Sequence, residues 1–151
     1  MKEIAAYTGC FVCGQDNNIG LKARFFYDGE KAVCDITAHE LYTGYKDIYH
    51  GGIVMTLMDE VMIKALLAEE VFVVTAEITV RLKRPVYSGD RLHFEGRKTR
   101  QKKDVIYFTE GVAVNQDGVT VAEATGRYVR PKNDLSGKLR QSVQGKDAES
   151  R

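Results

Sequence analysis

Two adjacent carboxylates, Asp59 and Glu60, lie near the middle of a strongly apolar segment, HGGIVMTLMDEVMIKALL, that spans residues 50–67. This pattern predicts a helix from residue 51 to about residue 68, and a helix that is apolar on nearly all sides is normally buried. A buried carboxylate must be paired, hydrogen-bonded or used in chemistry. Glu60 has Lys64 four residues later, which favours an ion pair, whereas Asp59 has Ile63 there. Asp59 is therefore the candidate general base or nucleophile.

The predicted helix begins with two glycines, Gly51 and Gly52, directly after His50. The first turn of a helix leaves amide N–H groups unpaired and carries a partial positive charge, so it attracts an anion or a developing oxyanion. Glycines let a ligand come close, and a histidine at this place can donate, accept or fix the loop. Close packing of the helix start is the competing interpretation of the same glycines.

The remaining elements that must position these groups are predicted to be strands, because residues rich in Val, Ile, Phe, Tyr and Thr alternate with turn signals. Four long strands cover residues 71–82, 91–99, 105–114 and 120–129, and a hairpin of residues 22–27 and 32–37 precedes the helix. One apolar helix can bury all its faces when an antiparallel sheet curls around it. The sequence therefore predicts an α+β roll.

Strict alternation within the first long strand divides its residues between two faces. It places Val73, Thr75, Glu77, Thr79 and Arg81 on one face. The apolar residues between them are expected to face the helix or another sheet layer.

Length, composition and charge limit the classes of protein to which the chain can belong. With 151 residues, 44% of them hydrophobic, it fits one domain, placed at residues 1–131, and residues 132–151 are expected to form a loose polar tail. The 22 Lys and Arg residues against 21 Asp and Glu give no reason to expect a nucleic acid or a membrane as partner. Since no signal segment or membrane span is recognisable, we expect a soluble cytoplasmic protein.

Three cysteines include a CxxC pair, Cys10 and Cys13, followed by Gly14. A structural zinc site usually needs four ligands, and no second CxxC or paired histidine follows. Cys34 lies in a predicted strand. We interpret the pair as a tight turn with small thiols, with redox or metal chemistry as the alternative, and expect no cofactor and no metal.

Several motifs together resemble one family. They are the HGG sequence with Asp59 nine residues after His50, the run ITVRLKRPVYSGDRL at residues 78–92, and CFVCGQDNNIGL at residues 10–21. In combination they resemble the hotdog-fold acyl-CoA thioesterases of the phenylacetate-degradation type, over about residues 10–131.

The resemblance implies a fold and an activity. The fold is an α+β hotdog, a curled antiparallel sheet wrapped around one central helix. The activity is hydrolysis of an acyl-CoA, or a related acyl thioester, to a free acid and a thiol. The acyl group itself is not predicted.

The resemblance also implies roles for single residues. The thioester carbonyl would dock at the amide of Gly51, joined by Gly52, while Asp59 activates water or attacks directly to form a mixed anhydride. Thr75 matches a position where some relatives carry a hydroxyl that orients the attacking water, although a threonine in a strand is also ordinary.

One departure from the family concerns the second oxyanion donor. Some relatives carry Asn or Gln ahead of the HGG, whereas this chain has Gly44 six residues before His50. Either backbone amides suffice here, or His50 or Tyr45 supplies the second donor.

The length of the helix bears on assembly. Two turns separate Gly52 from Asp59 by roughly 10 Å along the axis, too far for one carbonyl to touch both. The oxyanion hole and the acid are therefore expected to come from different subunits of a homodimer with shared active sites, and a homotetramer built from two dimers is the larger alternative.

Two basic runs are candidates for binding the phosphates of coenzyme A. The first is Arg81, Lys83 and Arg84, and the second is Arg97, Lys98, Arg100, Lys102 and Lys103. Solvated strand edges are the competing interpretation of both.

Two other functions remain open on the same scaffold. A hotdog dehydratase or hydratase needs a His-bearing helix entry that is not matched here. The second alternative is a non-catalytic acyl-CoA-binding protein or sensor. Sensors on this scaffold attach a DNA-binding segment, but only about 20 residues precede the first predicted strand here, too few for a helix-turn-helix.

Overall fold

One antiparallel sheet is the framework of the structure, a computed structural model that describes residues 1–132 and 134–149. Its strands are β1 (Lys2–Glu3), β2 (Phe26–Tyr27), β3 (Ala32–Thr37), β4 (Val74–Leu82), β5 (Arg91–Lys102), β6 (Ile106–Val114) and β7 (Thr120–Val129). They lie in the spatial order β1-β2-β3-β5-β6-β7-β4, and every neighbouring pair is antiparallel. Strand β4, the first long strand after the helix, is therefore an edge of the sheet.

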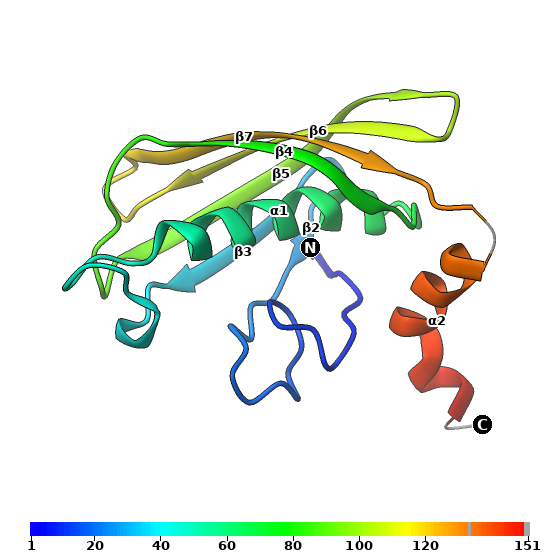
Figure 1. Cartoon of the computed structure of the whole chain (residues 1–151), viewed down its shortest axis with the longest axis horizontal. Coiled ribbons are helices and arrows are strands. Elements are labelled where there is room, and N and C mark those ends of the chain that lie inside the picture. The colour runs from blue at the N-terminus through cyan, green and yellow to red at the C-terminus, as the bar shows by residue number, and fades with distance from the viewer. Residues whose placement is uncertain (133, 150–151) are drawn as a thin grey trace.

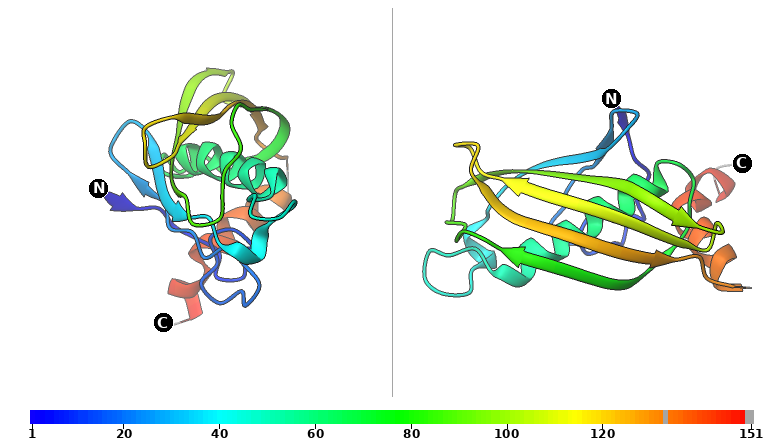
Figure 2. Two further views of the ribbon diagram at one scale, coloured as in Figure 1. Left: turned by 90° about the vertical axis from the view of Figure 1, so that its left-hand side faces the viewer. Right: turned by 90° about the horizontal axis from the view of Figure 1, so that it is seen from above.

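The sheet curls around helix α1 (Gly51–Leu67), which runs along its inner face (Figures 1 and 2). Many apolar side chains of α1, among them Leu57, Met58 and Val61, are fully buried. Strand β5 comes close to the helix because Gly96 has no side chain: a Cβ there would lie 2.5 Å from the carbonyl oxygen of Val61. A short 3-10 helix, η1 (Glu40–Tyr42), precedes α1.

The predicted central helix and the four long strands are confirmed, with differences at their ends. Strand β4 begins at Val74, so residues 71–73 lie outside it. The predicted hairpin strand over residues 22–27 is wrong in extent, because only Phe26–Tyr27 pair with β3. Lys22, the first residue of that predicted strand, adopts a left-handed backbone with φ 53°, which is incompatible with an extended strand.

The expected loose tail is instead helical, as α2 (Asp134–Glu149) follows β7 (Figure 1). Leu135, Leu139 and Val143 recur every four residues, so they form one apolar stripe on this helix. The Arg140 guanidinium lies 4.4 Å from the ring centroid of Phe72, which ties α2 to the segment before β4. Three apolar residues in a polar run were too weak a signal for us to expect a helix.

The helices that the structure describes lack the length and apolar character that a membrane span requires. The domain boundary at residue 131 stays a prediction.

Candidate active site

The Asp59 carboxylate on α1 is held by two hydroxyl groups from the sheet. Tyr128 on β7 donates to Asp59 Oδ1 at 2.9 Å, and Thr75 on β4 donates to the same oxygen at 3.0 Å, with 3.3 Å to Oδ2. Since one hydroxyl proton makes one strong hydrogen bond at a time, Oδ2 is the less engaged oxygen. Asp59 is half-buried and Thr75 is exposed, so the site opens at the β4 edge.

A β-bulge at Ala76 turns Thr75 toward the helix. Thr75 pairs with Tyr128 and Glu77 pairs with Arg127, so Ala76 is an extra residue on the β4 side. Directly opposed residues point to the same face of a sheet, and Tyr128 points at α1. Our prediction that Thr75 shares the face of Glu77 is therefore wrong, because strict alternation fails at the bulge.

Tyr128 was not among the predicted site residues. Its ring is fully buried, and burial, followed by the charge of Asp59, raises the pKa of the phenol. The phenol thus stays protonated and acts as a donor to the carboxylate. A buried tyrosine in a strand is ordinary, and only the pairing of β4 with β7 identifies this one.

The start of α1 offers one free amide. His50 is the N-cap, and its Nδ1 accepts a hydrogen bond from the Gly52 N–H at 2.8 Å. The Gly52 amide that we expected in the oxyanion hole is therefore occupied. Among the described residues, the Gly51 N–H donates to no acceptor. Because Nδ1 accepts, a neutral His50 carries its proton on Nε2.

The residues before the helix explain the departure from the family at Gly44. A Cβ at Gly44 would lie 3.3 Å from Cδ2 of His50, so the glycine leaves room for the ring of the capping histidine. Tyr45, the other candidate oxyanion donor, is 84% exposed and forms no side-chain hydrogen bond with a described residue.

A cavity of about 220 Å³ lies beside Gly51 and brings part of the predicted phosphate site to the helix start. Lys83 and Arg84 line it together with Leu82. Arg81 does not: it lines a different hollow on the outer face of the sheet, so the predicted cluster of three cations is divided. Lys83 is also paired with Glu123 at 3.2 Å.

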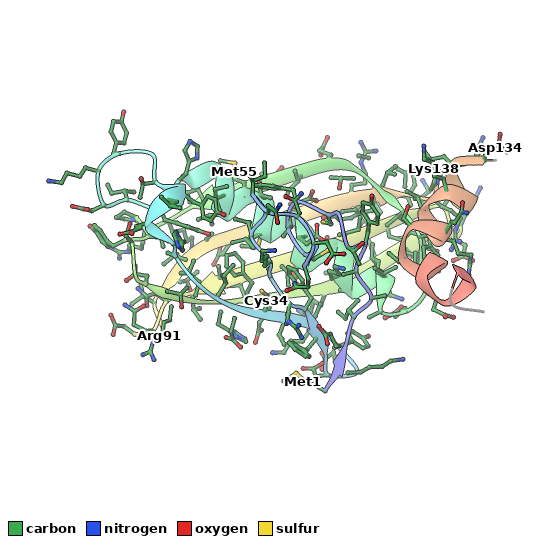
Figure 3. The ribbon with its side chains drawn as sticks, turned by 90° about the horizontal axis from the view of Figure 1, so that it is seen from below. Met1, Cys34, Met55, Arg91, Asp134 and Lys138 are labelled. Carbon is green, nitrogen blue, oxygen red and sulfur yellow. The ribbon has the colours of Figure 1, made fainter. Side chains whose placement is uncertain are left out.

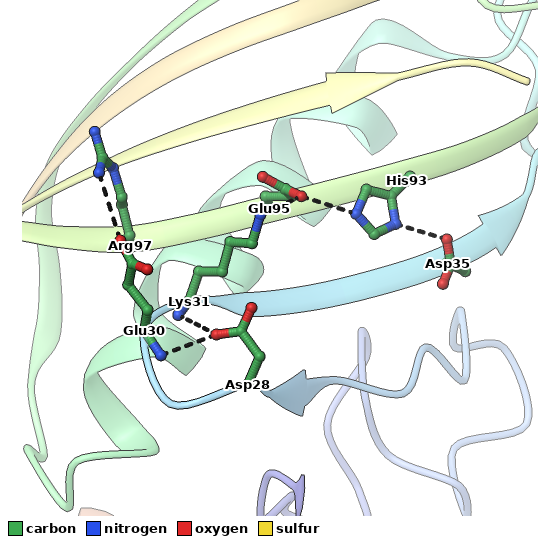
Figure 4. Close-up of polar contacts among 7 residues, drawn as sticks. All are labelled: Asp28, Glu30, Lys31, Asp35, His93, Glu95 and Arg97. Carbon is green, nitrogen blue, oxygen red and sulfur yellow. Dashed lines mark hydrogen bonds and ion pairs between the residues drawn. The ribbon is translucent and has the colours of Figure 1, made fainter. Parts of the chain in front are cut away.

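A hollow of about 480 Å³ lies on the outer face of the sheet, and Asp59 is not among the residues that line it. Its charged groups largely satisfy one another: Lys31 pairs with Glu95 at 2.7 Å, and His93 links Glu95 to Asp35 (Figure 4). Burial lowers the pKa of His93, but these two carboxylates raise it by more. We assign no chemistry to this hollow.

The prediction that Glu60 pairs with Lys64 is confirmed. The carboxylate and the ammonium are 3.9 Å apart, and both side chains are largely buried. The Lys64 ammonium also donates to the main-chain oxygen of Ala5 at 2.5 Å. Glu60 is thus separate from the Asp59 site.

The chain belongs to the thioesterase superfamily, whose sequence profile matches residues 47–122. This match includes the start of α1, Asp59 and Thr75. A search of curated proteins found no match.

Solved structures confirm the α+β hotdog fold. Escherichia coli PaaI, from the phenylacetic acid degradation operon, is 25% identical with a TM-score of 0.68, and the alignment covers 73% of this chain and 84% of PaaI. A hypothetical thioesterase of Streptococcus pneumoniae TIGR4, solved with coenzyme A, is 20% identical with a TM-score of 0.62, over 71% and 86% of the two chains. The smu.793 protein of Streptococcus mutans UA159, bound to acetyl CoA, is 20% identical with a TM-score of 0.62, over 75% and 93%.

Proposed function

We propose that this protein hydrolyses an acyl-CoA to a free acid and coenzyme A, with Asp59 as the reactive group. The observation that carries the proposal is the Asp59 carboxylate, fixed through Oδ1 by Tyr128 and Thr75 at an open edge of the sheet. A carboxylate fixed in this way has one oxygen available for water or for a carbonyl carbon.

Asp59 acts as a general base on water, or as a nucleophile that forms a mixed anhydride. Both routes need the ionised carboxylate and a fixed geometry. Tyr128 supplies the fixed donor. The Thr75 hydroxyl, within 3.3 Å of both carboxylate oxygens, is suited to orient the attacking water.

The developing oxyanion is stabilised by the Gly51 amide at the positive end of α1. One preorganised donor of this kind is typically worth about 10² to 10³ in kcat. His50 maintains the donor indirectly, because its cap fixes the first turn. Lys83 and Arg84, in the cavity beside Gly51, are suited to bind the phosphates of coenzyme A.

Structures of the relatives support this assignment. The Streptococcus pneumoniae thioesterase was also solved with an aspartate and a threonine each replaced by alanine, and these residues are sixteen positions apart in its chain. Asp59 and Thr75 have the same separation. The coenzyme A and acetyl CoA in the two streptococcal structures support an acyl-CoA ligand.

We further propose a homodimer whose active sites combine Gly51 of one subunit with Asp59 of the other. The cavity beside Gly51 is not lined by Asp59, Thr75 or Tyr128, so a single chain keeps the two halves apart. Strand β4 has a free edge, and apolar side chains near it are exposed, among them Met55 (42%) and Leu82 (45%), the former labelled in Figure 3. A tetramer of two dimers and the cytoplasmic location stay predictions.

The direct test is Asp59→Asn, assayed by thiol release over aryl, short and long acyl-CoA substrates. The Asn oxygen can still accept from Tyr128 and Thr75, so the fold should persist while kcat falls by about 10² to 10⁴. Tyr128→Phe and Thr75→Val should each lower kcat by a smaller factor than Asp59→Asn does. Asp117→Asn, in the exposed β6–β7 turn, is the matched control.

Unchanged turnover in Asp59→Asn would refute the assignment. Saturable acyl-CoA binding by the wild type without thiol release, across the whole panel, would instead indicate a binding protein.

A further inference from the structure

A second group of reactive side chains lies on the other side of α1. The Sγ atoms of Cys10 and Cys13 and a carboxylate oxygen of Glu60 all lie within 4.8 Å of one another. The Lys64 ammonium is next to them, 3.9 Å from Glu60. The cysteines come from the N-terminal loop and the two charges from α1, so the tertiary structure brings them together.

The loop presents the two thiols in a fixed arrangement. Cys10 Sγ accepts hydrogen bonds from the backbone N–H groups of Val12 at 3.3 Å and Cys13 at 3.4 Å. The turn closes where the Gly14 N–H donates to the Cys10 carbonyl at 2.9 Å. A Cβ at Gly14 would lie 2.4 Å from the Cys10 nitrogen, so this turn requires glycine.

The surroundings make the two thiols unequal. Hydrogen bonding from the Cys13 thiol, then from the backbone amides, outweighs burial and lowers the pKa of Cys10 to about 5, with a small contribution from Lys64. The same bond and burial raise the pKa of Cys13. Burial is also the main reason that the pKa of Glu60 rises to about 7. Cys10 is thus a thiolate, Cys13 a thiol, and Glu60 a carboxylate of intermediate basicity.

The thiols can be reached from outside. They line a cavity of about 200 Å³, whose apolar walls include Phe72 and, from α2, Leu139 and Val143. Cys10 is half-buried and Cys13 is buried. A low-pKa, partly exposed thiolate beside a second cysteine is typical of redox-reactive sites.

We propose that Cys10 and Cys13 are a thiol–disulfide redox couple whose substrate is a low-molecular-weight disulfide. Cys10 Sγ attacks one sulfur of the disulfide, the S–S bond breaks, and one thiolate leaves. Cys13 then passes its proton to Glu60, and its sulfur attacks Cys10 Sγ and displaces the second thiolate. The two cysteines lose two electrons, which the substrate gains, and Glu60 returns the proton to a departing thiolate.

A bound metal explains this group less well. Among the described residues the group offers three ligand atoms, whereas a structural zinc site takes four. The Lys64 ammonium beside Glu60 would also repel a cation. Zinc binding is therefore the competing outcome of the test.

The test uses the full-length reduced protein and oxidised glutathione, read by intact mass and peptide mapping. The wild type should lose the mass of two hydrogen atoms and contain a Cys10–Cys13 disulfide. Cys13→Ser should stop with one glutathione on Cys10, and Cys10→Ser should not react. Cys34→Ser is the matched control, because Cys34 is buried within β3 (Figure 3) and should not matter.

Two further readouts separate chemistry from folding. Alkylation of Cys10 in the wild type should follow a titration near pH 5, set by the Cys13 thiol and the backbone amides, with Lys64, while Glu60 is the charged neighbour on the other side. Glu60→Gln should form the mixed disulfide normally but accumulate it, because closure loses its base. A wild type that stays a dithiol, or that binds one zinc ion which blocks alkylation until it is chelated, would overturn the proposal.

Discussion

At Asp59, two hydroxyl groups from different strands meet one carboxylate oxygen, and their burial differs. Tyr128 is fully buried and fixed, whereas Thr75 is exposed at the sheet edge and can exchange its partner for water. A fixed donor orients the carboxylate and an accessible one meets the solvent. This asymmetry is the reason to expect different kinetic effects from the two residues.

Replacing His50 separates a capping role from a catalytic one. His50→Ala should lower the free energy of unfolding by about 1 kcal/mol, because the Gly52 amide loses its acceptor. His50→Asn restores a capping oxygen and should recover both stability and turnover. Denaturant unfolding and kcat should be measured on both variants. If Asn restores stability but kcat stays tenfold low, the imidazole Nε2–H is itself an oxyanion donor.

At the scale of elements, α1 carries reactive groups on two of its sides. Adjacent helical residues point about 100° apart, so Asp59 and Glu60 face different surroundings. Asp59 meets β4 and β7, whereas Glu60 meets the N-terminal loop with its cysteines. The bulge in β4 completes the first site, because it adds the one residue that turns Thr75 inward.

The buried Glu60 should make stability depend on pH. Its carboxyl has a pKa of about 7 in the folded protein, raised from 4.5 mainly by burial. The folded state therefore keeps a proton that the unfolded state releases, so the stabilisation that depends on Glu60 is full below about pH 4.5 and is lost as pH rises to about 7, while the lowered pKa of Cys10 acts in the opposite direction. The loss should be roughly 3 kcal/mol.

The free energy of unfolding should be measured for the reduced wild type and for Glu60→Gln from pH 4 to pH 8, a range that extends about one unit above this window. The difference in free energy of unfolding between wild type and Glu60→Gln should fall by roughly 3 kcal/mol over this range, whereas the difference between wild type and Glu70→Gln, a change at an exposed carboxylate just after α1, should stay constant. If the free energy of unfolding depends on pH equally in wild type and in Glu60→Gln, the raised pKa of Glu60 is contradicted.

At the scale of the whole molecule, the free β4 edge and the separation of Gly51 from Asp59 point to the same assembly. An unpaired edge strand exposes N–H and C=O groups that a second copy can use. Pairing there would bring the Asp59 side of one chain toward the other chain. The proposed site is therefore a property of the pair of subunits.

Subunit mixing tests the shared site. Gly51→Pro removes the free amide at the first helical position, where proline is well tolerated, and His50 already has the extended backbone that precedes proline. Alone it should lower kcat by about 10² to 10³. Mixed with Asp59→Asn, each heterodimer should contain one intact site and regain up to half of wild-type activity.

Subunit exchange must be verified by mass spectrometry before the activities are compared. Activity that stays at the level of the separate variants, after exchange is verified, would place the whole site within one chain.

The fold was largely predictable, and so was the difference between the two acids of α1. Apolar periodicity identified α1 and the long strands, and the i+4 neighbours separated Asp59 from Glu60, because both signals are local. The α2 helix was not expected, since its short apolar stripe matters only once it packs beside Phe72. Arg81 was grouped with Lys83 and Arg84 by sequence, but β4 ends at Leu82, so Lys83 and Arg84 lie beyond the strand and line a different cavity.

The central helix, its glycine start, an aspartate without an ion-pair partner on that helix and the CxxC turn could all be predicted from the sequence, because each depends on residues within a few positions. Strand pairing and packing set which groups meet them. Tyr128 reaches Asp59 through strand pairing, Thr75 through a bulge, and Glu60 reaches the cysteines through a loop that folds back onto α1. These contacts join residues far apart in the chain, so their geometry depends on packing and register.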